Sequence, residues 1–289
     1  MTDVAVACCQ LAPVIGELEA NRARAEAAIE AAAGNGANVI VLPELCNSGY
    51  VFEDADEARR LSEPVDGPTV TAWIGLARAH DVVIVGGFCE LDVDGDVRNS
   101  AALVDSSGLR ALYRKVHLWD REGDVFVPGT DPPAVVDTAL GRIGVVICYD
   151  VEFPEWVRLA GLAGAELLCA PVNWPAVPRP AGERAGEVVR VQAGAATNRM
   201  FIAACDRVGI ERGVDWIGGS VIADCGGFAV AGPAQAGEET LLMADCRLAD
   251  ARDKSLNQRN DVFADRRPEL YEGLVTGRFA VPADRGTPR

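Results

Sequence analysis

Short apolar runs recur along the chain, and they constrain its fold more than any other feature. Rich in Val, Ile, Ala and Cys and bounded by Gly, Asp or Pro, each run is typical of a β-strand. Several runs lack a polar–apolar alternation, which favours strands that are covered on both faces or lie in the inner layers of a sandwich. The runs are residues 4–11, 39–42, 82–88, 100–105, 143–148, 166–173, 201–208, 220–224 and 240–246.

Helical patterns lie between these runs. Residues 18–33 are Ala-rich with interspersed acids and arginines, and a helical stop signal, Asn-Gly, follows at 35–36. Residues 68–80 and 154–164 each open with Pro, which suits the first turn of a helix, and residues 183–199 form a fourth helical stretch. Strands alternating with helices predict an α/β domain.

The chain has 289 residues, of which 49% are hydrophobic, so it can bury a large core without disulfides. It shows no internal boundary, linker or short repeat. We therefore expect a single domain over residues 1–275 and a C-terminal tail over 276–289, ending in ADRGTPR.

The charge and the cysteine pattern exclude several function classes. A net charge of −16 repels phosphate backbones and anionic membranes, so we expect no nucleic-acid partner and no membrane partner. No window approaches the length of a membrane span and no signal peptide is evident, which predicts a cytoplasmic protein. With nine cysteines in mostly apolar surroundings, no CxxC and only two histidines, the chain predicts free thiols, no metal site and no cofactor.

Three polar residues stand just after strand-like runs. Glu44 follows VIVLP, Lys115 follows LYR, and Cys148 ends IGVVI. Lysine is rare here, since 25 of the 27 basic residues are arginine, and a retained lysine indicates that a compact ammonium was needed. Each residue also has a plainer interpretation, as a solvated loop acid, an exposed cation and a core thiol.

The chemistry of this trio is coherent. A cysteine is nucleophilic as a thiolate, and a carboxylate beside it can take the thiol proton. A fixed ammonium can stabilise the oxyanion of a tetrahedral intermediate, and the backbone N–H of Tyr149 is the natural second donor. This constellation needs neither a histidine nor a metal.

The chain resembles the nitrilase superfamily of carbon–nitrogen hydrolases from about residue 3 to about residue 270. Three motifs carry the resemblance: VIVLPELCNSGY (39–50), LYRKVHLWDREGDVFVPG (112–129) and GRIGVVICYDVEFPE (141–155). The resemblance implies a four-layer αββα sandwich fold. Members of the superfamily pair into dimers or larger homo-oligomers, so it also implies a homo-oligomer. It also implies Glu44 as the general base, Lys115 as the oxyanion-stabilising lysine, Cys148 as the nucleophile and Glu122 as a second glutamate near the lysine and the substrate amide.

The residues after Cys148 restrict the class of substrate that the resemblance implies. Tyr149-Asp150 replaces the Trp-Glu that is usual in true nitrilases, and Glu152 stands where carboxylate-binding branches tend to place arginine. CYDVEFPE resembles the aliphatic amidases, especially those acting on ω-amino amides such as 5-aminopentanamide. Glu152 then either pairs with a substrate ammonium or serves a structural role, for instance bonding backbone amides at the helix start near Pro154.

Four further residues are candidate pocket residues: Asn173, Trp174, Tyr50 and Trp119. His117 is interpreted as a packed or satisfied histidine, and residues 255–271 as a packing or subunit-contact segment. Two rival functions stay open. One is an N-carbamoyl amine or amino acid hydrolase using the same residues, and the other is a catalytically silent scaffold subunit.

Overall fold

The computed structural model describes residues 3–277, which fall into two compact units. The first ends at Asp253 and the second begins at Lys254. The second contains the short helices η4 (Pro268–Leu270) and α6 (Glu272–Thr276). The domain boundary expected at residue 275 remains a prediction, and residues 278–289 of the expected tail lie outside the described residues.

One six-stranded sheet combines strands from the N-terminal half of the first unit with β14 from near its C-terminal end. Its central strands β1, β2 and β3 are parallel to one another, and every other pairing in the sheet is antiparallel. In spatial order the strands are β14 (Thr240–Cys246), β1 (Val4–Gln10), β2 (Val39–Val41), β3 (Val83–Leu91), β4 (Val97–Asp105) and β5 (Gly108–Arg114).

A second six-stranded sheet repeats this plan. Strands β7, β8 and β9 are parallel, and the flanking strands are antiparallel. In spatial order the strands are β13 (Ala229–Ala231), β12 (Val221–Ala223), β9 (Phe201–Cys205), β8 (Leu167–Pro171), β7 (Gly141–Val145) and β6 (Ala134–Thr138).

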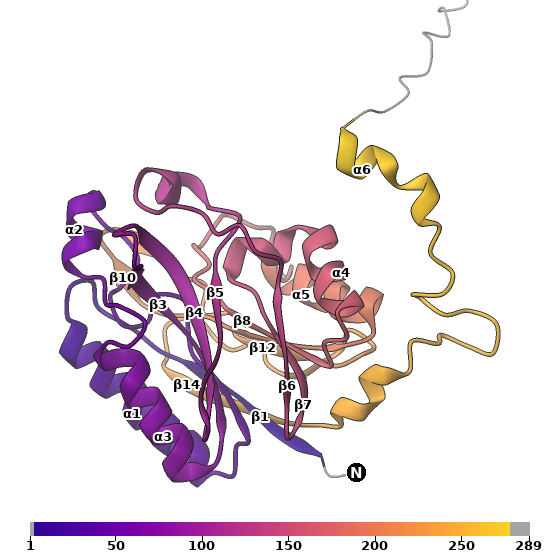
Figure 1. Cartoon of the computed structure of the whole chain (residues 1–289), viewed down its shortest axis with the longest axis horizontal. Coiled ribbons are helices and arrows are strands. Elements are labelled where there is room, and N and C mark those ends of the chain that lie inside the picture. The colour runs from indigo at the N-terminus through magenta and orange to yellow at the C-terminus, as the bar shows by residue number, and fades with distance from the viewer. Residues whose placement is uncertain (1–2, 278–289) are drawn as a thin grey trace, which may run out of the picture. The chain divides into compact units, whose positions relative to one another are not determined.

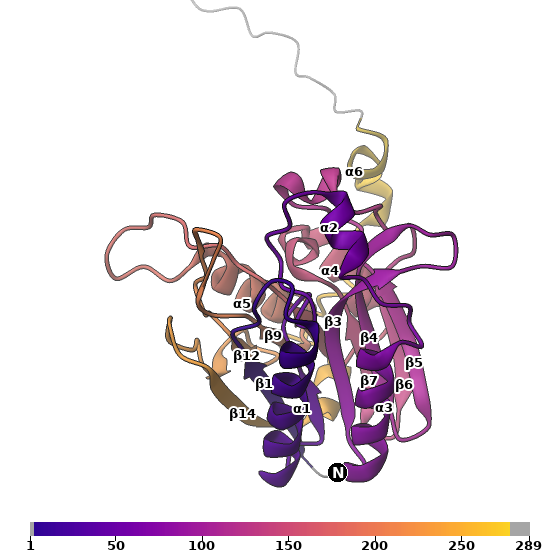
Figure 2. The ribbon, with the colours of Figure 1, turned by 90° about the vertical axis from the view of Figure 1, so that its left-hand side faces the viewer.

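Helices cover the outer face of each sheet. In Figure 1, α1 (Leu18–Gly34) and α3 (Pro68–His80) lie on one outer side of the first unit, and α4 (Pro154–Leu162) and α5 (Gly186–Asn198) lie on the other, with both sheets between them. The turned view in Figure 2 shows α1 and α3 against the strands of the first sheet. The predicted four-layer αββα sandwich is confirmed.

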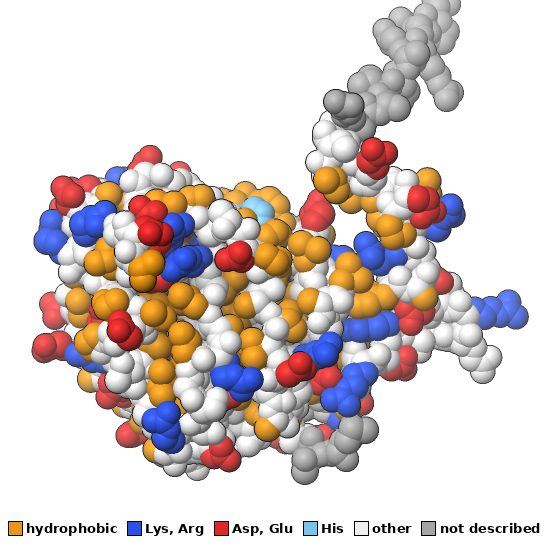
Figure 3. Space-filling view, viewed as in Figure 1, with side chains coloured by type: hydrophobic (Ala, Val, Ile, Leu, Met, Phe, Trp, Pro, Cys, Tyr) orange, Lys and Arg blue, Asp and Glu red, His pale blue; other side chains and the backbone are white. Residues whose placement is uncertain are grey.

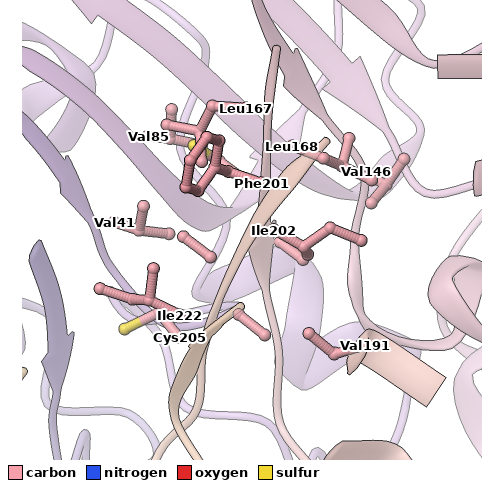
Figure 4. Close-up of a cluster of buried hydrophobic side chains, with 14 of the residues drawn as sticks. Val41, Val85, Val146, Leu167, Leu168, Val191, Phe201, Ile202, Cys205 and Ile222 are labelled. Carbon is pink, nitrogen blue, oxygen red and sulfur yellow. The ribbon is translucent and has the colours of Figure 1, made fainter. Parts of the chain in front are cut away.

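Strand β2 shows why the apolar runs do not alternate. Val39 and Val41 pack into the core between the sheets, whereas Ile40 and Leu42 pack under the helices of the first sheet. Because both faces of the strand are dry, both sets of alternating positions are apolar. Figure 4 shows the inter-sheet core, where Val41 and Val85 of the first sheet meet Phe201 and other side chains of the second.

Each of the nine predicted runs overlaps a strand, and each of the four helical patterns overlaps a helix. The elements missed are polar or short, so no apolar pattern marks them. They are β5, β6, β13, α2 (Ala55–Arg60), α6, the hairpin β10 (Ile210–Glu211) and β11 (Val214–Asp215), and the 3-10 turns η1 (Asp120–Asp124), η2 (Cys148–Glu152), η3 (Leu248–Arg252) and η4.

On the face shown in Figure 3, acidic and basic side chains of the first unit are interspersed. Over residues 3–277, no helix combines the length and the apolar character that crossing a bilayer requires.

Candidate active site

The three predicted residues follow three strands. β5 pairs antiparallel with β4, which pairs antiparallel with β3, so β5 runs in the same direction as β2 and β3. Their carboxyl ends therefore share one edge of the first sheet. Lys115 directly follows β5, and Glu44 lies shortly beyond β2. Cys148 comes from the second sheet, where it opens η2 after β7.

A buried ionic cluster forms at this edge. Lys115 Nζ lies 2.8 Å from Glu44 Oε1 and 2.8 Å from Glu122 Oε1. All three side chains are buried, with Lys115 and Glu44 fully enclosed. Glu122 also accepts the backbone N–H of Trp119 at 2.7 Å, which fixes the carboxylate from within η1. One ammonium thus holds two carboxylates in a dry environment.

Asn99 of β4 completes the cluster. Its Nδ2 donates to Glu44 Oε1 at 2.7 Å and to Glu122 Oε1 at 3.3 Å. The other carboxylate oxygen, Glu44 Oε2, is buried and has no hydrogen-bond partner within the described structure. Because buried polar atoms are nearly always paired, an oxygen left open beside a thiol is a candidate proton acceptor.

Close packing fixes the backbone at Glu44. Gly87 of β3 lies so near that a Cβ there would meet the Glu44 Cα at 2.5 Å. Backbone hydrogen bonds on either side, Gly87 N to Pro43 O and Cys46 N to Gly87 O, hold the two segments together. Any side chain at Gly87 would displace the carboxylate from its place in the cluster.

Cys148 stands at a strained turn. Its φ of 46° lies in the left-handed region, which a non-glycine residue adopts only where the surrounding structure enforces it. The Cys148 Sγ donates to the Asn173 carbonyl at 3.6 Å, and Asn173 Nδ2 donates to the Glu44 carbonyl at 2.9 Å. Asn173 thus links the thiol of the second sheet to the carboxylate segment of the first.

The environment sets the protonation states. Burial raises the pKa of Glu44 to about 7, with the Lys115 charge opposing that rise and the Glu122 charge adding to it. Burial and the Glu44 charge raise the pKa of the Cys148 thiol well above its ordinary value, while Lys115 acts to lower it. The resting site therefore holds a neutral thiol beside a carboxyl group that titrates near neutrality, where a general base works best.

Asp150 is a connecting residue that the sequence did not reveal. Its fully buried carboxylate accepts the Tyr113 hydroxyl at 2.7 Å, the Ile147 backbone N–H at 3.0 Å and the His117 backbone N–H at 3.1 Å. His117 Nδ1 also lies 2.7 Å from it, and the His117 ring stacks on Phe153 at 3.8 Å. The interpretation of His117 as a satisfied histidine fits this geometry. Asp150 ties the turn before Cys148 to the segment after Lys115.

A pocket of about 400 Å³ lies beside the cluster. Three predicted residues line it: Tyr50, Trp119 and Glu122. Glu122 contacts Lys115 on its other side, and the Trp119 ring packs edge-on against Tyr149, the residue after the thiol, at 4.9 Å. The pocket therefore meets the cluster through Glu122, whereas Cys148, Tyr149 and Asn173 are not among its lining residues.

Trp174 and Glu152 lie elsewhere. Trp174 is buried, and its backbone N–H donates to Asp206 at 3.0 Å; its ring is absent from the pocket lining among the described residues. Glu152 lies 3.3 Å from Arg190 of α5 and does not line the pocket either. Within residues 3–277, Glu152 forms an ion pair with α5, and no hydrogen bond joins its carboxylate to the backbone amides near Pro154; its pairing with a substrate ammonium stays a prediction.

Sequence reasoning missed several residues of the site. Asn99 carried one usable signal, a polar amide just before an apolar strand run. Trp216 and Val214, which line the pocket from the β10–β11 hairpin, carried none, because they are distant in sequence from every motif. Over residues 3–277, no group of three His, Cys, Asp or Glu side chains is arranged to hold a metal ion.

Residues 5–254 match the family model described as carbon-nitrogen hydrolase. The chain belongs to this family, within the nitrilase superfamily. Over 272 residues it is 39% identical to a protein named nitrilase from Pyrococcus abyssi, covering 93% of this chain and 99% of the relative. It is 35% identical to the N-carbamoylputrescine amidase of Solanum lycopersicum, covering 90% and 91%.

A solved structure extends the likeness to three dimensions. This carbon–nitrogen hydrolase superposes on an amidase from Nesterenkonia sp. AN1 with a TM-score of 0.77 and 26% identity, covering 94% of this chain and 97% of the other. That structure shows the acetamide moiety of fluoroacetamide covalently added at the active-site cysteine of the Nesterenkonia enzyme. The chain is therefore a hydrolase acting on carbon–nitrogen bonds other than peptide bonds.

Proposed function

We propose that this carbon–nitrogen hydrolase is an amidase that releases ammonia from small linear amides through a thioester on Cys148. The observation that carries the proposal is the buried cluster of Glu44, Lys115 and Glu122, which acts electrostatically on the Cys148 thiol and leaves Glu44 Oε2 open. A nucleophile, a base and a cation in one dry site are what acyl transfer requires.

Acylation proceeds in two proton transfers. Glu44 takes the thiol proton as the Cys148 sulfur attacks the carbonyl carbon, and the carbonyl π electrons move to oxygen. The Lys115 ammonium and the Tyr149 N–H stabilise that oxyanion. As the tetrahedral intermediate collapses, its C–N bond breaks and Glu44 returns the proton to nitrogen, which leaves as ammonia.

Deacylation reverses the roles. Glu44 takes a proton from water, and the hydroxide attacks the thioester carbon. Collapse breaks the C–S bond, the sulfur regains the proton from Glu44, and the carboxylic acid leaves and ionises. Glu122 holds the Lys115 ammonium through a second 2.8 Å contact besides that of Glu44, which keeps the ammonium in one place through both steps.

The experiment combines ammonia release with intact-mass analysis. An amide panel of aliphatic, ω-amino and carbamoyl compounds is assayed, and acid-quenched enzyme is digested to locate an acyl adduct. The adduct is expected on the peptide that contains Cys148 and is expected to persist in Cys225→Ala, a matched control that removes a different cysteine. An adduct on another cysteine, or turnover in Cys148→Ala near the wild-type rate, contradicts the proposal.

The second candidate is hydrolysis of an N-carbamoyl amine with the same residues. The tomato N-carbamoylputrescine amidase, 35% identical over most of both chains, favours this reading. A ureido substrate yields carbon dioxide with the ammonia, so measuring both gases separates the two reactions.

A further inference from the structure

The pocket beside the cluster has predominantly apolar walls. Aromatic and aliphatic side chains from three separate segments supply most of its lining, among them Phe52, Trp119, Phe126, Val214 and Trp216. Phe52 and Phe126 pack edge to face at 5.7 Å, and Tyr50 meets Trp216 in the same way at 5.2 Å. An apolar pocket of about 400 Å³ is suited to a hydrophobic group larger than a methyl.

Three of the four charged residues that line the pocket are engaged by the protein. Glu122 is paired with Lys115. Arg212 makes a two-pronged contact with Glu57, at 2.6 and 2.7 Å, and donates to the Val51 carbonyl at 2.8 Å. Arg121 donates to the Glu53 carbonyl at 3.1 Å. Both arginines thus serve to fasten residues 51–57.

The remaining charge, Asp120, is exposed to solvent at the pocket. An exposed carboxylate competes with water for a substrate ammonium, so a pairing there contributes little. The other acid considered for this role, Glu152, pairs with Arg190 away from the pocket lining. The described pocket therefore offers a substrate ammonium no sheltered carboxylate that is free to pair.

We propose that this pocket selects amides whose acyl group is apolar and uncharged at its far end, of branched-aliphatic or aryl size, and that Val214 is a specificity-determining residue. The inference rests on the proposed amidase function. It names the acyl class that the aliphatic-amidase resemblance left open.

The hairpin that carries Val214 is well suited to this role. Its two turn residues, Arg212 and Gly213, have φ values of 47° and 85°, the conformation of a tight two-residue hairpin turn. Glu211 accepts the backbone N–H groups of Tyr50 at 2.8 Å and Val51 at 2.7 Å. These bonds anchor the hairpin to the opposite wall, so the Val214 side chain is presented from a fixed position.

The test compares two amides of matched shape. Hexanamide and 5-aminopentanamide differ only in having a methyl or an ammonium at the chain end. We expect kcat/KM for hexanamide to exceed that for 5-aminopentanamide at least about tenfold, because the apolar walls do not replace the hydration of an ammonium. Along the straight-chain series from acetamide to hexanamide, kcat/KM is expected to rise by up to about fourfold per methylene, equivalent to ~0.8 kcal/mol per buried CH₂.

Val214→Asp places a carboxylate in the wall and is expected to reverse the preference toward 5-aminopentanamide. Val214→Thr is the matched control, since it keeps the shape without the charge and is expected to retain the preference for hexanamide. Asp120→Asn is expected to leave the ratio within about twofold. A wild-type preference for 5-aminopentanamide, or a ratio that Val214→Asp does not move, overturns the inference.

Equilibrium binding separates this inference from the proposed function. Calorimetry on the Cys148→Ser variant measures the affinity for the same two amides without turnover. Tighter binding of hexanamide supports the pocket inference even if no ammonia is released by the wild type, an outcome that would overturn the proposed reaction. Turnover that favours the charged amide would leave the proposed reaction standing and overturn the pocket inference alone.

Discussion

The ionic cluster and the pocket share Glu122 but are built in opposite ways. Around Lys115 the side chains are charged, enclosed and held by short bonds, whereas the pocket is walled by aromatic and aliphatic groups. The cluster and Cys148 are anchored at strand ends of two packed sheets, while the pocket depends on surface ion pairs such as Arg212–Glu57. On the proposed function, the reacting groups are thus fixed by the core, and substrate choice belongs to segments that can change without disturbing the core.

The difference has an energetic basis. Burying an ion pair costs desolvation that the pair's attraction only partly offsets, so the cluster is a poor source of stability. Its strained Cys148 backbone adds to the cost. The pocket walls, by contrast, contribute ordinary hydrophobic burial. A buried ionic cluster that costs stability is best explained by a role in chemistry, and mutations in the cluster and in the pocket can test the comparison.

The largest effect is expected for Cys148→Ala. Removing the nucleophile is expected to lower kcat by a factor of at least about 10⁴, because the thioester can no longer form. The circular dichroism spectrum and the melting temperature are expected to stay near those of the wild type, since one buried sulfur is lost at a strained position. A kcat within tenfold of the wild type would show that another group attacks the substrate.

Lys115→Met is expected to damage both activity and stability. It leaves the Glu44 and Glu122 carboxylates buried without their cation, and breaking a buried pair in this way costs about 3–5 kcal/mol. Urea unfolding at pH 8 measures the loss. At pH 5 the loss is expected to shrink, because the Glu44 carboxyl group, whose pKa burial raises to about 7, is then protonated and no longer repels Glu122. Arg142→Met, which removes an exposed pair with Asp137, is a control expected to cost less than about 1 kcal/mol.

The pH dependence sharpens the role of Glu44. With its pKa raised by burial to about 7, kcat/KM is expected to rise with pH around a midpoint near 7 as the base ionises. Asp206 is also buried with its pKa raised to about 7, so a midpoint alone is ambiguous. In Asn99→Leu the carboxylate loses a donor, and the midpoint is expected to move up by about one unit. A midpoint that does not move would show that the rise of kcat/KM with pH reports the ionisation of another group.

The raised pKa of Glu44 also affects stability: a rise in pH that increases kcat/KM is expected to lower the free energy of unfolding. The pKa of Glu44 in the folded protein, about 7, lies above its ordinary value of 4.5. Its contribution to stability is therefore fully present below about pH 4.5 and is lost as the pH rises through about 7. Relative to the wild type, Glu44→Gln is expected to flatten this part of the stability profile, measured by urea unfolding between pH 5 and 8.

The smallest effect is expected at the pocket rim. Arg212→Gln removes the contact with Glu57 and loosens residues 51–57, which is expected to raise KM two- to fivefold with kcat nearly unchanged. Glu57→Gln is the matched variant from the other side and is expected to behave alike. A fall in kcat equal to the rise in KM would mean that the rim acts on the chemistry and not only on the walls.

The sequence by itself determined the fold class and predicted the candidate reacting residues Glu44, Lys115 and Cys148. Apolar runs without alternation identify the strands of the sandwich, which are covered on both faces. Lys115 and Cys148 stand out because of their residue types and their positions at the ends of strand-like runs. A sequence pattern predicts a strand or helix only where several apolar residues recur. The elements β10, β11 and α2 are short and polar, so no such pattern predicts them.

Only the tertiary structure decided what these residues contact. Glu44 meets Lys115 across 71 positions of sequence, Arg212 meets Glu57 across 155, and Glu152 faces Arg190 rather than the pocket. Asn99 and Asp150 acquire their roles in the same way, through partners that no motif specifies. The sequence specifies the chemistry of each side chain. Burial and proximity arise only when distant strand ends and loops pack together. Burial and the neighbouring charges set the pKa of Glu44, and the packing of distant segments creates the apolar pocket.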